Sequence, residues 1–82
     1  MKKFTYVITD EAGIHARPAG TLIKMVKDLS SSVTLTKDGR TVDASRLMAV
    51  MSLGVKRGEE VTVAVEDDRD FETVKSFFEK NL

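Results

Sequence analysis

Hydrophobic and polar residues repeat with two different periods along the chain. Four segments have extended character, with apolar and polar residues alternating as in a strand that buries one face. Three others repeat apolar residues every three or four positions, as an amphipathic helix does. The predicted strands lie in residues 3–9, 33–36, 41–42 and 61–66, and the predicted helices in residues 16–29, 47–53 and 67–82. The expected order of elements is therefore β-α-β-β-α-β-α.

Short polar segments indicate where the chain turns between these elements. Residues 10–13 (DEAG) end the first strand, and the serines at 30–32 close the first helix as a turn rather than a linker. The Asp-Gly pair at 38–39 suits the positive φ angles of a tight hairpin. Asp67 and Asp68 stand where a helix N-terminus favours negative charge, so the last helix is expected to begin there.

The predicted fold is of the α+β class. Four strands that are apolar on one face need cover on that face, and three helices with one apolar stripe each can supply it. The sequence therefore predicts two layers, with the other face of the sheet open to solvent, but periodicity does not fix the strand order. The 82 residues are expected to form one domain, residues 1–82, because independent domains usually need roughly 100–150 residues.

Composition and charge exclude several classes of function. The chain has no cysteine and a single histidine, which excludes disulfides and a cysteine-based or multi-histidine zinc site, so we expect no metal. Thirteen basic residues balance thirteen acidic ones, so the field that attracts nucleic acid or anionic lipid is missing at the level of the whole chain. No segment has the length and apolarity of a membrane span, and the N-terminal residues are not a secretory signal. We therefore expect a cytoplasmic protein without membrane insertion.

One cluster, residues 13–19, carries candidate chemistry where the first strand leads into the first helix. Pro18 is tolerated only in a first helical turn, which puts His15 at or near the N-cap. Unpaired amides and the positive end of the helix make an anion site there, and Arg17 can meet phosphate oxygens. We expect these positive surroundings to favour a neutral, nucleophilic imidazole that accepts a phosphoryl group. Local chemistry alone leaves a plain capping or loop histidine equally open.

Two motifs extend this interpretation to a family. The chain contains GIHARPA at residues 13–19 and LMAVMSLG at residues 47–54. With these motifs and the order of elements, it resembles HPr, the histidine-containing phosphocarrier family of the bacterial phosphoenolpyruvate-dependent sugar phosphotransferase system (PTS). The resemblance covers essentially the whole chain. It implies an open-faced antiparallel sheet in the strand order 1-4-2-3, with three helices on one face.

The resemblance also implies a role for each residue of the first motif. Enzyme I would phosphorylate His15 on Nδ1, at the expense of phosphoenolpyruvate, giving pros-phosphohistidine. Arg17 would support the phosphate, with the helix N-terminus formed by Ala16, Arg17 and Pro18 behind it. EIIA proteins or domains of sugar permeases would then take the phosphoryl group. Such a protein is a carrier and not a stand-alone enzyme, needs no cofactor, and is expected to be a monomer.

The second motif gains a docking role from the same resemblance. Burial statistics alone favour a core role for its large apolar residues. In HPr-like proteins, part of this short helix is exposed and contacts partners, a use that suits flexible methionine side chains. The expected docking residues are Leu47, Met48 and Met51, with a polar and basic rim of Gly20, Thr21, Lys24 and Lys27. We expect Arg17, the two lysines and Arg46 to gather around the His15 end, although the lysines are equally consistent with a solvated helix face.

Two departures from relatives have consequences. Arg46 occupies the position where Gram-positive relatives carry a kinase-regulated serine, and Ser45 stands one place earlier. Arginine has no hydroxyl to phosphorylate, so we expect this kinase control to be absent, leaving Ser45 and Ser52 as the alternatives. Ala12 stands where relatives often have asparagine or serine, so a side-chain hydrogen bond from that position is lost.

Two other functions compete with a sugar phosphocarrier. One is an HPr-like regulatory protein, in a nitrogen-related phosphotransferase branch or as a co-regulator of catabolite repression. The other is a binding module that is not phosphorylated, for protein or for single-stranded RNA on the open sheet face. That use of a sheet needs exposed aromatics and a basic field, so five aromatics mostly on apolar stripes argue against RNA.

Overall fold

The computed structural model describes residues 1–29 and 31–82. Its elements confirm the predicted order, with a short 3₁₀ helix, η1, added before the last helix. In chain order they are β1 (Lys2–Val7), α1 (Ala16–Lys27), β2 (Val33–Lys37), β3 (Arg40–Asp43), α2 (Leu47–Ser52), β4 (Glu60–Val65), η1 (Asp68–Asp70) and α3 (Phe71–Asn81). Ser30, part of the predicted serine turn, lies outside the described residues.

Element ends differ from the prediction where local hydrogen bonds redirect the chain. β1 ends before Thr9, because the Thr9 amide donates to Leu82 O at 2.6 Å instead of to a neighbouring strand. α1 ends at Lys27, before Leu29, whose amide donates to Val26 O in the tighter spacing common at helix ends. Asp67 accepts the Arg69 amide at 2.9 Å and caps η1, whereas the last helix, α3, begins at Phe71 and not at Asp67 as predicted.

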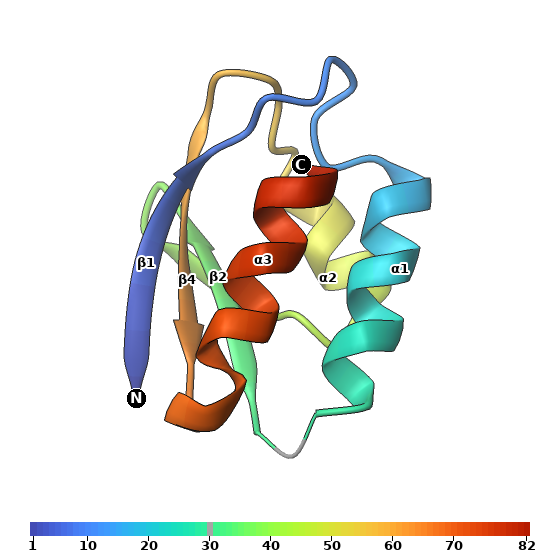
Figure 1. Ribbon diagram of the computed structural model, residues 1–82. Coiled ribbons are helices and arrows are strands. Elements are labelled where there is room, and N and C mark those ends of the chain that lie inside the picture. The colour runs from blue at the N-terminus through green and yellow to red at the C-terminus, as the bar shows by residue number, and fades with distance from the viewer. Residues whose placement is uncertain (30) are drawn as a thin grey trace.

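The four strands form one antiparallel sheet in the order β1-β4-β2-β3. This is the order that the resemblance implied. Figure 1 shows the three α-helices on one face of the sheet, with the other face left uncovered. The β2–β3 hairpin turns at residues 38–39 with φ angles of 51° and 81°, so the Asp-Gly prediction is confirmed.

Strand register separates an apolar face from a polar one. Side chains at alternate positions of β2 and β4 are fully buried under the helices: Val33, Leu35, Val61, Val63 and Val65. On the open face, the pairing aligns one threonine from each strand in a row: Thr5, Thr62, Thr36 and Thr41. Threonine keeps the β-branched shape that suits a strand and adds a hydroxyl for solvent, so this face can remain uncovered.

Aromatic side chains lie on the helix side of the sheet. Phe78 of α3 is fully buried and meets Phe4 and Tyr6 of β1 edge to face, with ring centroids 5.6 and 5.7 Å apart. Phe71 makes a similar contact with Phe4, and Phe77 with Phe78. All five aromatic residues are therefore engaged in one cluster on that side.

No helix within residues 1–29 or 31–82 combines the length and apolarity that crossing a bilayer would require.

Candidate functional site

His15 is the N-cap residue of α1, as predicted. Its backbone is extended, with φ −102° and ψ −177°, and its carbonyl accepts from the Ala19 amide at 2.9 Å. Among the described residues, its imidazole makes no capping hydrogen bond, so the ring is not used to close the helix. The first turn, residues 16–19, contains no acidic residue that would offset the positive end of the helix.

A tight turn presents His15 in this position. Asp10 accepts the Ala12 amide on Oδ1 at 2.9 Å and the Gly13 amide on its carbonyl, also at 2.9 Å. Gly13 has a φ of +69°, and a Cβ at this position would lie 2.2 Å from Val55 O. The next residue, Ile14, is buried and donates its amide to the same Val55 oxygen at 3.0 Å. The connection between α2 and β4 therefore holds the turn that carries His15.

The imidazole opens on a pocket of about 320 Å³. The pocket is lined by Asp10, His15, Arg17, Pro18, Thr21, Lys80 and Asn81. Four of these residues were predicted from the sequence, whereas Asp10 and the two residues of α3 were not. Asp10 is the negative neighbour of the site, with its Oδ1 3.7 Å from His15 Nε2. The surroundings of His15 are therefore mixed in charge and not uniformly positive as expected.

The predicted docking residues of α2 are partly exposed and partly buried. Met48 and Leu47 are 78% and 41% exposed, whereas Val50 on the other side of α2 is buried. Met51 is partly buried and packs against the core. A surface cavity of about 680 Å³ is lined by Lys27, Ser45, Arg46, Leu47, Met48 and Ala49. Core packing thus accounts for part of this motif, and its first turn stays available for contacts.

The predicted basic group around His15 does not form as one cluster. Lys24 and Lys27 are in the last turn of α1. Lys27 is twelve residues beyond the cap, which corresponds to roughly 18 Å of helical rise. There it lines the same cavity as Arg46, whereas Arg17 lines the His15 pocket. The expectation was wrong because the lysines of one helix stripe are spread along its axis.

The rim residues nearest His15 have different surroundings. Thr21 lines the His15 pocket and donates its hydroxyl to Arg17 O at 3.2 Å. Gly20 is half-buried, and apart from its chain neighbours and the backbone of its own helix, no atom of the described residues lies within 4 Å of where its Cβ would be. A partner surface can therefore approach the backbone closely at Gly20.

The segment before α2 contains no hydroxyl at the cap. Arg46 is the N-cap residue of α2, with an extended backbone. The amide and hydroxyl of Ser45 donate to Asp43 Oδ1 at 2.8 and 2.7 Å. These two bonds hold the pKa of the Asp43 carboxyl below its usual value. Ser45 is thus engaged with a carboxylate, an unfavourable neighbour for a phosphate.

Two of the residues missed by sequence reasoning differ in how they could have been found. Asp10 begins an Asp-x-x-Gly turn, whose aspartate commonly accepts backbone amides and therefore lies close to the turn. Lys80 gives no such signal, because it reaches the His15 pocket only through the packing of α3 against α1.

Comparisons with known proteins agree with this geometry. The model of the PTS-HPr family, described as the phosphorylation site of the PTS HPr component, matches residues 2–79. HPr-C-His from Thermoanaerobacter tengcongensis is 32% identical, with a TM-score of 0.89, and the match covers 98% of this chain and 93% of that one. The histidine-containing phosphocarrier protein of Mycoplasma is 30% identical, with a TM-score of 0.82 and coverage of 96% and 89%.

A third similar structure is that of a protein named for catabolite repression. Crh, the catabolite repression protein of Bacillus subtilis, is 29% identical, with a TM-score of 0.74 and coverage of 94% of this chain and 92% of that one. The Crh structure is an intertwined dimer with a swapped domain.

Proposed function

The chain belongs to the PTS-HPr family, and we propose that it is a phosphocarrier that takes a phosphoryl group from enzyme I on His15 and passes it to EIIA proteins or domains of sugar permeases. The observation that carries this proposal is the placement of the only histidine at the N-cap of α1, beside a pocket that Arg17 also lines. The amides of Ala16 and Arg17 have no partner within the helix and can receive phosphate oxygens.

Nδ1 is the ring nitrogen that we assign to the phosphoryl group. Nε2 faces the Asp10 carboxylate at 3.7 Å, where a phosphoryl dianion would be repelled. In the forward step, the Nδ1 lone pair forms the bond to phosphorus, and the bond to the donor atom of enzyme I breaks with its electron pair. In the second step, a nucleophile of EIIA forms the new bond, and Nδ1 recovers its lone pair. Arg17 offers two parallel hydrogen bonds to the phosphoryl oxygens throughout.

The same features support the remaining parts of the proposal. The pocket offers a nucleophile and hydrogen-bond donors to phosphate oxygens, and the larger partners would supply the rest of each active site. The protein would therefore act as a carrier and not as a stand-alone enzyme. The aromatic cluster lies on the helix side of the sheet, which removes the stacking platform that an RNA-binding sheet uses. A small carrier that exposes one site to successive partners needs no second copy of itself, so we propose a cytoplasmic monomer whose partners are proteins and not nucleic acid or membrane.

A regulatory protein of the HPr family is the second candidate, and the similarity to Crh favours it. Arg46 at the cap of α2 weighs against any form of regulation that depends on a serine phosphate at that position. A regulatory role that uses the phosphate on His15 as its signal remains compatible with the site.

The test is phosphorylation by enzyme I and labelled phosphoenolpyruvate. We expect one phosphate that is labile in acid and stable in base, transferable to an EIIA protein, and absent in His15→Ala. Ser45→Ala is the matched control and should keep the label. A phosphate that survives acid, or no label with an enzyme I that labels itself, contradicts the proposal. Efficient labelling without transfer to any EIIA protein favours the regulatory candidate.

A further inference from the structure

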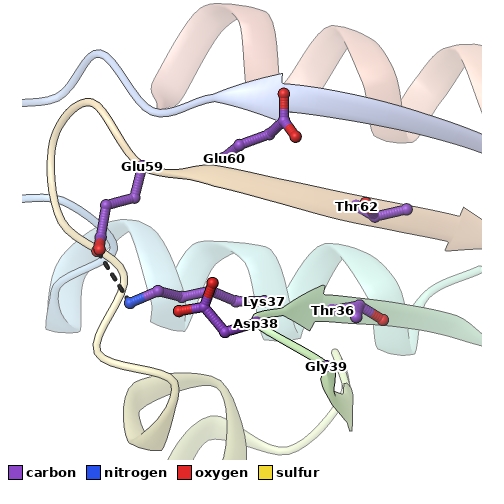
Figure 2. Close-up of a pocket in the computed structure, with 7 residues that line it drawn as sticks. All are labelled: Thr36, Lys37, Asp38, Gly39, Glu59, Glu60 and Thr62. Atoms are coloured by element: carbon purple, nitrogen blue, oxygen red, sulfur yellow. Dashed lines mark hydrogen bonds and ion pairs between the residues drawn. The ribbon is translucent and has the colours of Figure 1, made fainter.

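Lys37, at the end of β2, is a charged residue whose side chain is largely buried. It follows Val33 and Leu35 at the two-residue period of the strand, so it lies on the helix side of the sheet. Its side chain is 14% exposed, which is unusual for lysine unless the ammonium is well paired. Figure 2 shows it directed toward Glu59, at the rim of a cavity between the β2–β3 turn and the start of β4.

The Lys37 ammonium has three acceptors. Nζ lies 2.9 Å from Glu59 Oε1, and it also donates to Leu53 O at 3.4 Å and to Gly54 O at 3.3 Å. The two carbonyls belong to the end of α2, where a cation satisfies orphan oxygens and complements the helix dipole. Lys37 therefore joins the hairpin, the end of α2 and the loop before β4.

Glu59 fixes the other side of this loop. The Glu59 Oε1 that accepts from Lys37 also accepts the Lys56 amide at 2.7 Å. These two hydrogen bonds, first that of Lys37 and then that of Lys56, hold the pKa of the Glu59 carboxyl below its usual value. The carboxylate thus remains charged at neutral pH and closes the loop of residues 54–59.

The closed loop is the one that holds His15 in place. Val55, between Gly54 and Lys56, accepts the Ile14 amide at 3.0 Å and approaches Gly13 so closely that no Cβ fits. Lys37 is thus linked to His15 by the Glu59 carboxylate, by the loop of residues 54–59 and by the hydrogen bond from the Ile14 amide to Val55 O. Arg40, directly across from Lys37 in the hairpin, donates to Ser52 O at 3.3 Å and reinforces the hold on α2.

We infer that the Lys37–Glu59 pair is a positioning device for phosphotransfer, which fixes the α2–β4 loop and through it the orientation of His15. This inference rests on the proposed function of His15. Neither residue lines the His15 pocket, so neither touches the phosphoryl group. Loss of the pair should leave the exposed docking residues Leu47 and Met48 in place, because they lie at the opposite end of α2 from the carbonyls that Lys37 binds.

The expected effect is on the rate of transfer and not on partner binding. We compare Lys37→Met, which keeps the apolar stem, and Glu59→Gln, which keeps the shape, with Lys3→Met, an exposed lysine of β1. In the first two variants, kcat for phosphorylation by enzyme I should fall about tenfold, within the range that small misplacements of reacting groups produce, while KM stays within about twofold. Lys37→Arg should restore most of the rate, because guanidinium can donate to both carbonyl and carboxylate.

Hydrogen exchange supplies a readout that does not depend on phosphorylation. Loss of the pair should speed exchange of the Ile14 amide about tenfold relative to amides of β4, because the loop opens locally. If the pair only stabilised the whole fold, exchange of the Ile14 amide and of the β4 amides would speed up together, and kcat would be unchanged below the melting temperature. Either a joint rise of the two exchange rates or an unchanged kcat overturns the inference. If the unmodified protein is not phosphorylated at all, the proposed function fails, and the exchange ratio still decides the positioning role. If Lys37→Met does not fold, Glu59→Gln carries the test.

Discussion

Gly13 is the residue at which the site turn is most sensitive to a single added carbon. Its φ of +69° lies in the left-handed region, which costs a non-glycine residue roughly 1–2 kcal/mol. In Gly13→Ala, the new Cβ would also lie 2.2 Å from Val55 O and 2.8 Å from Lys56 Cα, both of them backbone atoms. Relief requires a backbone shift, for which overpacking by one carbon typically costs about 1–3 kcal/mol.

The sum predicts that Gly13→Ala lowers the free energy of unfolding by about 2–5 kcal/mol. For a domain of this size, each kcal/mol corresponds to a fall of about 4–8 °C in melting temperature, so a loss of at least about 8 °C is expected. Gly39→Ala is the matched control: its φ is +81°, but apart from its two chain neighbours nothing among the described residues lies within 4 Å of its Cβ position. It should lose only the roughly 1–2 kcal/mol of the backbone conformation.

The assay is urea unfolding at 25 °C followed by circular dichroism, with His15 phosphorylation measured on the folded fraction. Because the shift falls on Val55 and Lys56, Gly13→Ala should also slow phosphorylation, whereas Gly39→Ala should not. If Gly13→Ala is no less stable than Gly39→Ala, the close approach at Val55 does not constrain this turn, and the account of how His15 is presented is wrong.

Three further predictions test other parts of the molecule. Met48→Ala should leave stability within about 0.5 kcal/mol, because the side chain is 78% exposed. The same change should weaken binding to enzyme I in titration calorimetry, and unchanged affinity would remove Met48 from the docking surface. The Arg69 side chain and amide lower the pKa of Asp67 to about 2, so its contribution to stability is present above about pH 4 and is lost as the pH falls toward 2. The stability difference between the unmodified protein and Asp67→Asn should therefore disappear over that range in acid titrations, and a constant difference would contradict the role of the carboxylate charge. Finally, treatment with a serine kinase that acts on Gram-positive relatives should add no phosphate mass at Ser45, and a shift of one phosphate there would show that Arg46 does not end this regulation.

Much of the candidate site follows from local sequence, because its determinants lie within a few residues of one another. Pro18 in a first helical turn is enough to place His15 at a cap, and the structure has it there. The alternation of apolar residues likewise predicts which face of β4 is buried. Such features depend on backbone geometry that neighbouring residues set by themselves.

The positions of charged side chains around His15 were predicted less well, because they depend on how far along its helix or turn each residue lies and not only on which face it occupies. Lys24 and Lys27 share a polar stripe with residues near His15, yet the helix carries them to its far end. Asp10 lies in the turn before the helix and is not part of its periodic pattern, yet its carboxylate comes within 3.7 Å of the imidazole in the folded protein.

Hydrophobic periodicity and turn residues were enough to predict the types and order of the elements, the two-layer fold class and the cap position of the histidine. The contacts between distant parts of the chain appear only in the folded protein: Val55 with Ile14, α3 with the His15 pocket, and, farther from that pocket, Lys37 with Glu59. These contacts depend on strand order and on how the helices and loops pack against the sheet, which bring together residues far apart in the chain. The periodic pattern of a helix or strand predicts which of its sides is buried, whereas the packing of that helix or strand in the fold decides which residues the buried side contacts.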